Sequence, residues 1–149
     1  MGIWQEVTDL LGWLQIVQAD RFEIGGEFAT PDIEERIRRG HPVGPRVTDA
    51  DLAKLEPRID TLDEEIEPPQ RFILPGGTPA AGHLHHAGTV CRRAERRVRM
   101  LARDEEAPTA IVRYLNRLSD TPFTMARAVS ACASITEPQW FGRDERTAT

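Results

Sequence analysis

Apolar residues recur at helical spacing along most of this chain, and no convincing strand pattern interrupts them. The clearest stretch follows Thr48, where apolar side chains come at steps of three, four, three and four, at Leu52, Leu55, Ile59, Leu62 and Ile66. This seam is suited to packing beside another helix in a bundle. Thr48 with acidic residues behind it, Asp49 and Asp51, is a typical N-terminus for such a helix.

Three further long segments share this periodicity. The stretch that precedes Val47 shows little periodicity and reads as a loop that contains a short helix. The helices are predicted at residues 4–28, 33–38, 48–66, 78–103 and 109–133. Pro79 fits the first turn of its helix, whereas Pro57 and Pro122 fall inside helices and are expected to kink them. The pattern predicts an all-α, up-down helix bundle with four main helices. One domain over residues 1–149 is expected, ending in an irregular tail at 137–149.

The composition argues against several classes of protein. Cys91 and Cys132 form no C-x-x-C pair, which disfavours a disulfide framework or a zinc site and favours a reducing, cytoplasmic setting. No apolar run reaches the length of a membrane span. A net charge of −5 disfavours a general affinity for nucleic acid. The cluster of His83, His85 and His86 is poorly spaced for a metal on a helix, so no metal site is predicted.

One predicted helix carries an unusual density of arginine. Four arginines and one glutamate occupy the six positions 92–97. At helical spacing Gly88, Arg92 and Glu95 share one face, and the remaining arginines point around it. A glutamate among arginines can hold guanidinium groups in place for an anion such as a triphosphate. An ordinary salt-bridge ladder on a solvated face is the alternative, and the residues alone leave both interpretations open.

Asn116 and Asp120 share one face of the last predicted helix, four residues apart. An asparagine amide beside a basic helix can read a ribose or base edge through its paired donor and acceptor. The alternative is an asparagine that satisfies backbone groups.

The aromatic residues carry separate expectations. The Pro/Gly-broken stretch 72–77 reads as an extended crossing loop, and its apolar side chains are expected to be buried. Trp4 and Trp13 are expected to be exposed, and the sequence leaves open whether they form a new interface. Trp140 and Phe141 are expected to dock on the bundle or on a partner.

Three motifs, in matching order, resemble those of the PduO-type corrinoid adenosyltransferases, also called ATP:cob(I)alamin adenosyltransferases. They are F-I-L-P-G-G at 72–77, the arginine-rich run at 90–98 and the stretch at 113–120. The first helix is similar too, at I-V-Q-A-D-R-F and E-F-A-T-P, and the resemblance extends from about Leu14 to Arg127. It implies a ferritin-like bundle of five helices assembled as a homotrimer, with ATP held between subunits and the corrinoid bound beside it.

The resemblance also implies an activity and its residues. The reaction is transfer of the 5′-deoxyadenosyl group from ATP, with Mg²⁺, to reduced corrinoid cobalt, giving adenosylcobalamin and triphosphate. Phe72 would cover the lower face of the corrin and exclude an axial ligand. The residues implied for ATP are Arg92, Arg93, Glu95, Arg96 and Asn116, of which Arg92 and Glu95 would be catalytic.

This sequence departs from the family pattern in three places. The family opens with a phosphate loop, T-x-x-G-D-x-G-x-T, and an acidic V-D-E-L-N helix, and this sequence begins after both. At Gly88 the family usually carries an arginine, which pairs with an aspartate of that early helix, and at Pro122 it carries an aliphatic residue. Two hypotheses follow. One is a working adenosyltransferase whose start lies upstream of Met1, and the other is a non-catalytic truncated relative that acts as a corrinoid-binding or oligomerisation module.

Overall fold

The computed structural model describes residues 3–30, 32–105 and 107–142, with side chains from residue 9 onward. Within these residues the chain forms five α-helices and one isolated antiparallel bridge between Ile73 and Gln139, so the all-α prediction is confirmed. The helices are α1 (Ile3–Phe28), α2 (Ile33–Arg38), α3 (Asp49–Glu65), α4 (Pro79–Asp104) and α5 (Thr109–Cys132). No helix in these described ranges is long and apolar enough to cross a membrane.

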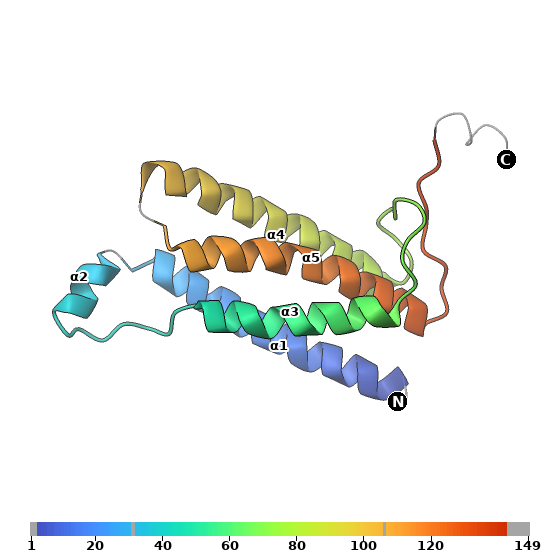
Figure 1. Cartoon of the computed structure of the whole chain (residues 1–149), viewed down its shortest axis with the longest axis horizontal. Coiled ribbons are helices and arrows are strands. Elements are labelled where there is room, and N and C mark those ends of the chain that lie inside the picture. The colour runs from blue at the N-terminus through green and yellow to red at the C-terminus, as the bar shows by residue number, and fades with distance from the viewer. Residues whose placement is uncertain (1–2, 31, 106, 143–149) are drawn as a thin grey trace.

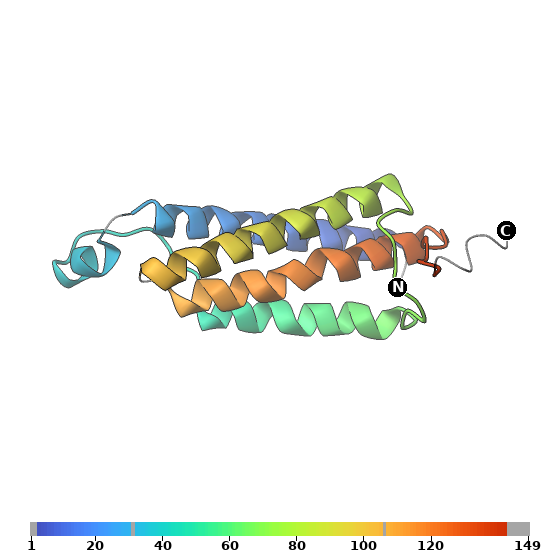
Figure 2. The same cartoon turned by 90° about the horizontal axis from the view of Figure 1, so that it is seen from above.

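The four long helices lie side by side and alternate in direction along the chain, whereas the short α2 stands off at one end (Figure 1). The view from above shows α4 and α5 adjacent, with α1 and α3 beside them (Figure 2). The up-down bundle predicted from the periodicity is therefore confirmed. The expected kinks at Pro57 and Pro122 stay predictions, since α3 and α5 each continue through their proline as one helix.

Helix α5 forms the centre of the bundle and contacts α1, α3 and α4. Its buried side chains include Ile111, Tyr114 and Leu118, each at most 1% exposed. The seam predicted on α3 faces this core, because Leu52, Leu55 and Ile59 are all buried there. Three neighbouring helices approach α5, so most of its surface is buried, and one stripe that includes Arg113, Asn116 and Asp120 stays exposed.

The helix starts follow the capping chemistry expected from the sequence. Thr48 and Asp51 form a reciprocal capping box at the start of α3, with the Thr48 backbone N–H donating to Asp51 Oδ2 at 3.0 Å. At the start of α4, Thr78 Oγ1 accepts a hydrogen bond from the Ala81 backbone N–H at 3.0 Å, and Pro79 takes the first helical position. These local signals fix where the two helices begin.

Two expectations about apolar exposure are wrong. Trp13 is only 4% exposed, because α1 turns it into the core, where the Arg58 guanidinium lies 5.9 Å from its ring centroid. Conversely, the 72–77 loop does not bury its apolar side chains: Phe72 is 80% exposed and Leu74 41% exposed. The loop pairs with the tail through its backbone, which leaves these side chains facing outward. The side chain of Trp4 lies outside the described residues.

Candidate functional site

The carboxylate of Glu95 joins the arginine-rich helix α4 to α5. Its Oε1 accepts hydrogen bonds from Arg99 Nε at 2.8 Å and from Asn116 Nδ2 at 3.0 Å. Because a carboxylate only accepts, the amide of Asn116 must turn its NH₂ group toward Glu95, which leaves Oδ1 free to accept from another donor. The side chain of Glu95 is only 12% exposed, but both of its partners are exposed, so the bridge lies at the surface of the bundle. The structure thus brings together two motifs that lie in different helices.

Arg92 lies one turn before Glu95 and faces Asp120 on α5. The distance from Arg92 Nη2 to Asp120 Oδ1 is 3.9 Å, and both side chains are more than half exposed. A contact of this length between exposed groups is too long for a hydrogen bond and contributes little to stability. The guanidinium of Arg92 therefore retains most of its donors for a ligand.

The other arginines of the 92–97 run point into solvent. Arg93, Arg96 and Arg97 are exposed, and no carboxylate of the described residues forms an ion pair with any of them. The salt-bridge ladder that was the alternative interpretation is limited, among the described residues, to the pair of Glu95 and Arg99, so it does not neutralise this face. Like charges at helical spacing repel one another, and a bound anion would relieve that repulsion. The geometry favours the anion-binding interpretation.

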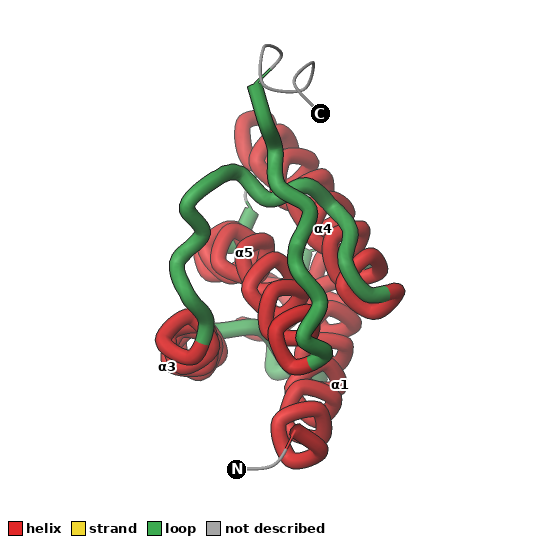
Figure 3. The backbone as a smooth tube through the Cα atoms, turned by 90° about the vertical axis from the view of Figure 1, so that its right-hand side faces the viewer, coloured by secondary structure: helices red, strands yellow, loops and turns green. Residues whose placement is uncertain are grey.

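Phe72 is carried by the loop that joins α3 to α4, at the end of the bundle where α5 finishes (Figure 3). Gly77 in this loop has φ +90°, a conformation that favours glycine, and a Cβ there would lie 2.8 Å from Ser130 Oγ, so a larger residue would also have to displace that hydroxyl. The Phe72 ring contacts Trp140 of the tail edge-on, with centroids 6.4 Å apart and planes at 78°. Neither of these rings is buried, which makes this end of the bundle an exposed aromatic surface.

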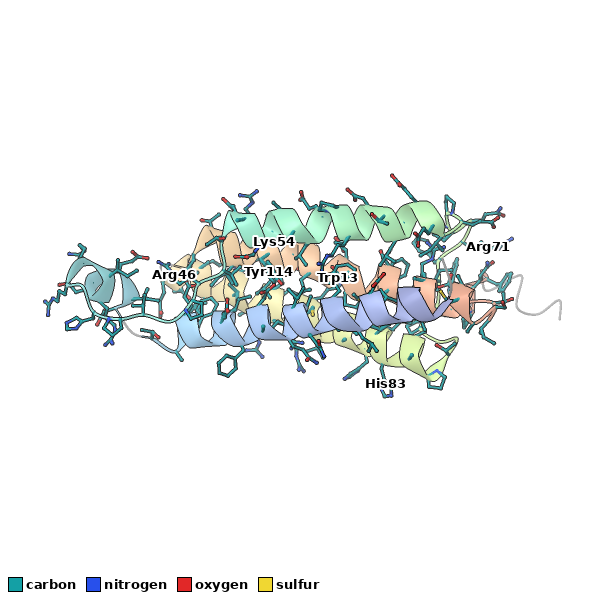
Figure 4. All side chains as sticks on the ribbon, turned by 90° about the horizontal axis from the view of Figure 1, so that it is seen from below. Trp13, Arg46, Lys54, Arg71, His83 and Tyr114 are labelled. Carbon is teal, nitrogen blue, oxygen red and sulfur yellow. The ribbon has the colours of Figure 1, made fainter. Side chains whose placement is uncertain are left out.

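Sequence reasoning missed a buried contact between α1 and α5. The hydroxyl of Tyr114, which is 0% exposed, donates a hydrogen bond to Asp20 Oδ2. Burial, followed by the neighbouring Asp20 carboxylate, raises the pKa of Tyr114 well above its ordinary value. Figure 4 shows Tyr114 and Trp13 between the helices. The sequence signal for this contact was a tyrosine, with its polar hydroxyl, on an otherwise apolar helix face. The partner could not be read from the sequence because Asp20 lies 94 positions before Tyr114.

A second missed group lies at the α2 end of the molecule. Arg46 Nη2 lies 2.8 Å from Glu27 Oε1 and 3.0 Å from Glu34 Oε1. The hydrogen bond to Glu27 raises the pKa of Arg46. These residues line an open cleft of about 970 Å³ between the C-terminal ends of α1 and α4 and the helix α2. The cleft contains none of the residues predicted for a site.

The histidine cluster does not converge. His83 and His86 are exposed, and Figure 4 shows His83 pointing away from the bundle. His85 packs edge-on against Phe123 with ring centroids 6.0 Å apart, and burial lowers its pKa. In the described part of the chain, no group of three or more His, Cys, Asp or Glu side chains could hold a metal ion.

The fold and these contacts define an all-α bundle with a cationic helix face suited to anion binding and an aromatic surface at one end. Residues 2–129 match the family model described as cobalamin adenosyltransferase. The chain therefore belongs to the cobalamin adenosyltransferase family, and the resemblance to PduO-type proteins is confirmed.

Curated relatives and solved structures agree with this assignment. A corrinoid adenosyltransferase of Bacillus subtilis is 39% identical over 132 residues, which cover 89% of this chain and 64% of that protein. The PduO protein of Salmonella typhimurium is 35% identical over 77% of this chain and 33% of its own length. A PduO-type ATP:corrinoid adenosyltransferase variant from Lactobacillus reuteri, complexed with cobalamin and ATP, superposes with a TM-score of 0.77 at 31% identity, covering 88% of this chain and 70% of that one. The chain thus spans less than two thirds of these curated relatives' lengths.

Proposed function

We propose that this chain transfers the 5′-deoxyadenosyl group from ATP to reduced corrinoid cobalt. The observation that carries the proposal is the Glu95 bridge to Asn116, which aligns the nucleotide motif of α5 beside the unneutralised arginines of α4. Membership of the family and the ATP and cobalamin complexes of its relative support the same ligands. An exposed aromatic loop at one end of α4 supplies a surface for a flat macrocycle.

In this proposal the arginines bind the triphosphate. Arg92, Arg93 and Arg96 donate hydrogen bonds to its oxygens. The Mg²⁺ that accompanies ATP coordinates the same triphosphate. Glu95 holds the Asn116 amide so that Oδ1 accepts from a ribose hydroxyl or an adenine amino group. The roles of Arg92 and Glu95 are the most direct, because both lie on the α4 face turned toward α5.

The chemistry is a nucleophilic displacement at the ribose C5′ carbon. The electron pair of the reduced cobalt forms the cobalt–carbon bond, and the C5′–oxygen bond breaks as its electrons leave with triphosphate. Cationic donors stabilise the charge that develops on the leaving oxygen. Phe72 would cover the lower face of the corrin, and its 80% exposure leaves the ring available for that contact.

One detail supports these assignments. The L. reuteri structures include variants at one phenylalanine and at one arginine, and those two positions are separated by as many residues as Phe72 and Arg92 are here. The proposal includes assembly as a homotrimer, as the family resemblance implies, in which a neighbouring subunit completes the binding of ATP. A cytoplasmic setting suits a reaction that requires reduced cobalt.

An anaerobic assay of the 149-residue chain with reduced cobalamin, Mg²⁺ and ATP tests the proposal, with formation of the cobalt–carbon bond followed by absorbance. Arg92→Gln is expected to lower kcat by about a hundredfold, because it removes a donor to the leaving group. Asn116→Ala is expected to raise the KM for ATP. Arg97→Gln is the matched control, an exposed arginine of the same helix, and should leave turnover unchanged.

A folded wild-type chain that shows no turnover beside an active relative would contradict the proposal. The alternative is a non-catalytic corrinoid-binding module, which the comparisons do not favour because the relatives are corrinoid adenosyltransferases. Gly88 is buried against α5, in the position where an arginine is usual in the family. Cobalamin binding without turnover, measured by equilibrium dialysis, would support that alternative.

A further inference from the structure

The C-terminal segment 137–141 runs beside the loop that carries Phe72 (Figure 3). The Leu74 backbone N–H donates to the Pro138 carbonyl at 2.7 Å, and the Trp140 N–H donates to the Phe72 carbonyl at 2.7 Å. Gly76 faces the Pro138 ring so closely that a Cβ there would lie 2.7 Å from Pro138 Cγ. The two segments are therefore shaped to each other as well as hydrogen-bonded.

A buried ion pair anchors this segment to the bundle. Arg127 of α5, whose side chain is 7% exposed, contacts Glu137 with Nε 3.2 Å from Oε2, and the Glu137 side chain is 16% exposed. The same guanidinium donates from Nη2 to the backbone carbonyl of Glu67, just beyond α3. One arginine thus ties together α5, the start of the Phe72 loop and the tail. We call residues 137–141 the strap.

Trp140 is the strap residue that contacts the Phe72 ring. Phe72 is 80% exposed and Trp140 47% exposed, and their edge-to-face contact is the ring pair that Phe72 makes within the described residues. An exposed phenylalanine on a loop would otherwise exchange between rotamers. The indole beside it removes part of that freedom. The next residue, Phe141, is also exposed, at 44%, but its ring lies under the Arg71 guanidinium instead.

We propose that Trp140 is a positioning residue that holds the Phe72 ring in place for the corrinoid, and that the strap fixes the loop that carries it. This inference rests on the proposed function only for the identity of the ligand. The ordering of the loop by Trp140 is a property of the chain alone. If Phe72 excludes a lower axial ligand, its ring must keep a fixed distance from the corrin and a fixed orientation against it. The reason is that catalytic groups lose effect when they are displaced by about an ångström.

Three variants of the full chain test the idea: Trp140→Ala, Trp140→Phe and, as a matched control, Phe141→Ala. The first measurement is amide hydrogen exchange over residues 71–77, with no ligand present. Trp140→Ala should speed exchange by roughly three- to tenfold, as expected from the loss of an edge-to-face pair. Trp140→Phe should restore most of the protection, and Phe141→Ala, whose ring contacts Arg71 and not Phe72, should change exchange at 72–77 less than Trp140→Ala does. Unchanged exchange in Trp140→Ala would overturn the proposal.

The second measurement uses Co(II) cobalamin with saturating ATP and reads, from the visible spectrum, the fraction of bound corrinoid that lacks its lower axial ligand. Trp140→Ala should lower this fraction toward that of Phe72→Ala, with the KM for ATP unchanged, and Trp140→Phe should retain it. If Trp140→Ala keeps the wild-type fraction of corrinoid without a lower axial ligand, the positioning role is overturned. A wild-type chain that binds no corrinoid would instead refute the proposed function, and the exchange data would still decide whether Trp140 orders the loop.

Discussion

Replacing Gly88 with alanine should stabilise the protein, although the residue is buried between two helices. Gly88 lies on α4 where this helix packs against α5. A Cβ at this position would lie 3.6 Å from Pro122 Cβ and 3.9 Å from the Ser119 carbonyl oxygen. Both are ordinary van der Waals distances, so the methyl group fits without movement of either helix.

The magnitude follows from two contributions. Alanine is better than glycine in a helix interior by about 1 kcal/mol. Burying one more methyl group adds up to about 0.8 kcal/mol. The expected gain is therefore about 1.5 kcal/mol, which for a chain of this size raises Tm by roughly 3–6 °C.

Thermal and urea unfolding followed by far-UV circular dichroism will measure this gain. Gly82→Ala is the control, because it lies in the same helix and a Cβ there meets nothing within 4 Å. It should gain no more than about 1 kcal/mol, the backbone contribution alone. If Gly88→Ala is less stable than the wild type while Gly82→Ala is not, α4 and α5 approach more closely than the structure shows, and the reasoning fails.

Two further predictions concern buried polar contacts. Tyr114→Phe removes the hydrogen bond to Asp20 and should cost about 2 kcal/mol in urea unfolding at neutral pH. Because the folded pKa of Tyr114 is raised, its contribution is present below pH 10, the ordinary tyrosine pKa, and declines above it, so the difference between the two proteins should shrink in alkali. Glu137→Gln should cost at least about 2 kcal/mol, because it leaves the Arg127 guanidinium buried without its counter-charge. Glu35→Gln, which removes two surface ion pairs at the end of α2, should change stability by less than about 1 kcal/mol.

The sequence predicted the helices closely because their signals are local. Periodic apolar residues determine which segments become helices, and a threonine with a following acidic residue or proline sets where α3 and α4 begin. The bounds of the short α2, 33–38, were also predicted, although the stretch around it shows little periodicity. The motifs that indicated the family are also continuous in sequence, so they could be read without a fold.

The tertiary structure decided which of these residues meet. Glu95 and Asn116 are 21 positions apart, and their contact depends on how α4 and α5 are rotated about their axes, which periodicity alone does not determine. The rotation of α1 about its own axis likewise turns the Trp13 side chain into the core. Phe72 is exposed because the loop satisfies its backbone against the tail, a pairing between segments with no shared pattern. The sequence therefore determined the helices and the chemical groups on their faces, and packing between helices determined which groups are buried, paired or left free to bind.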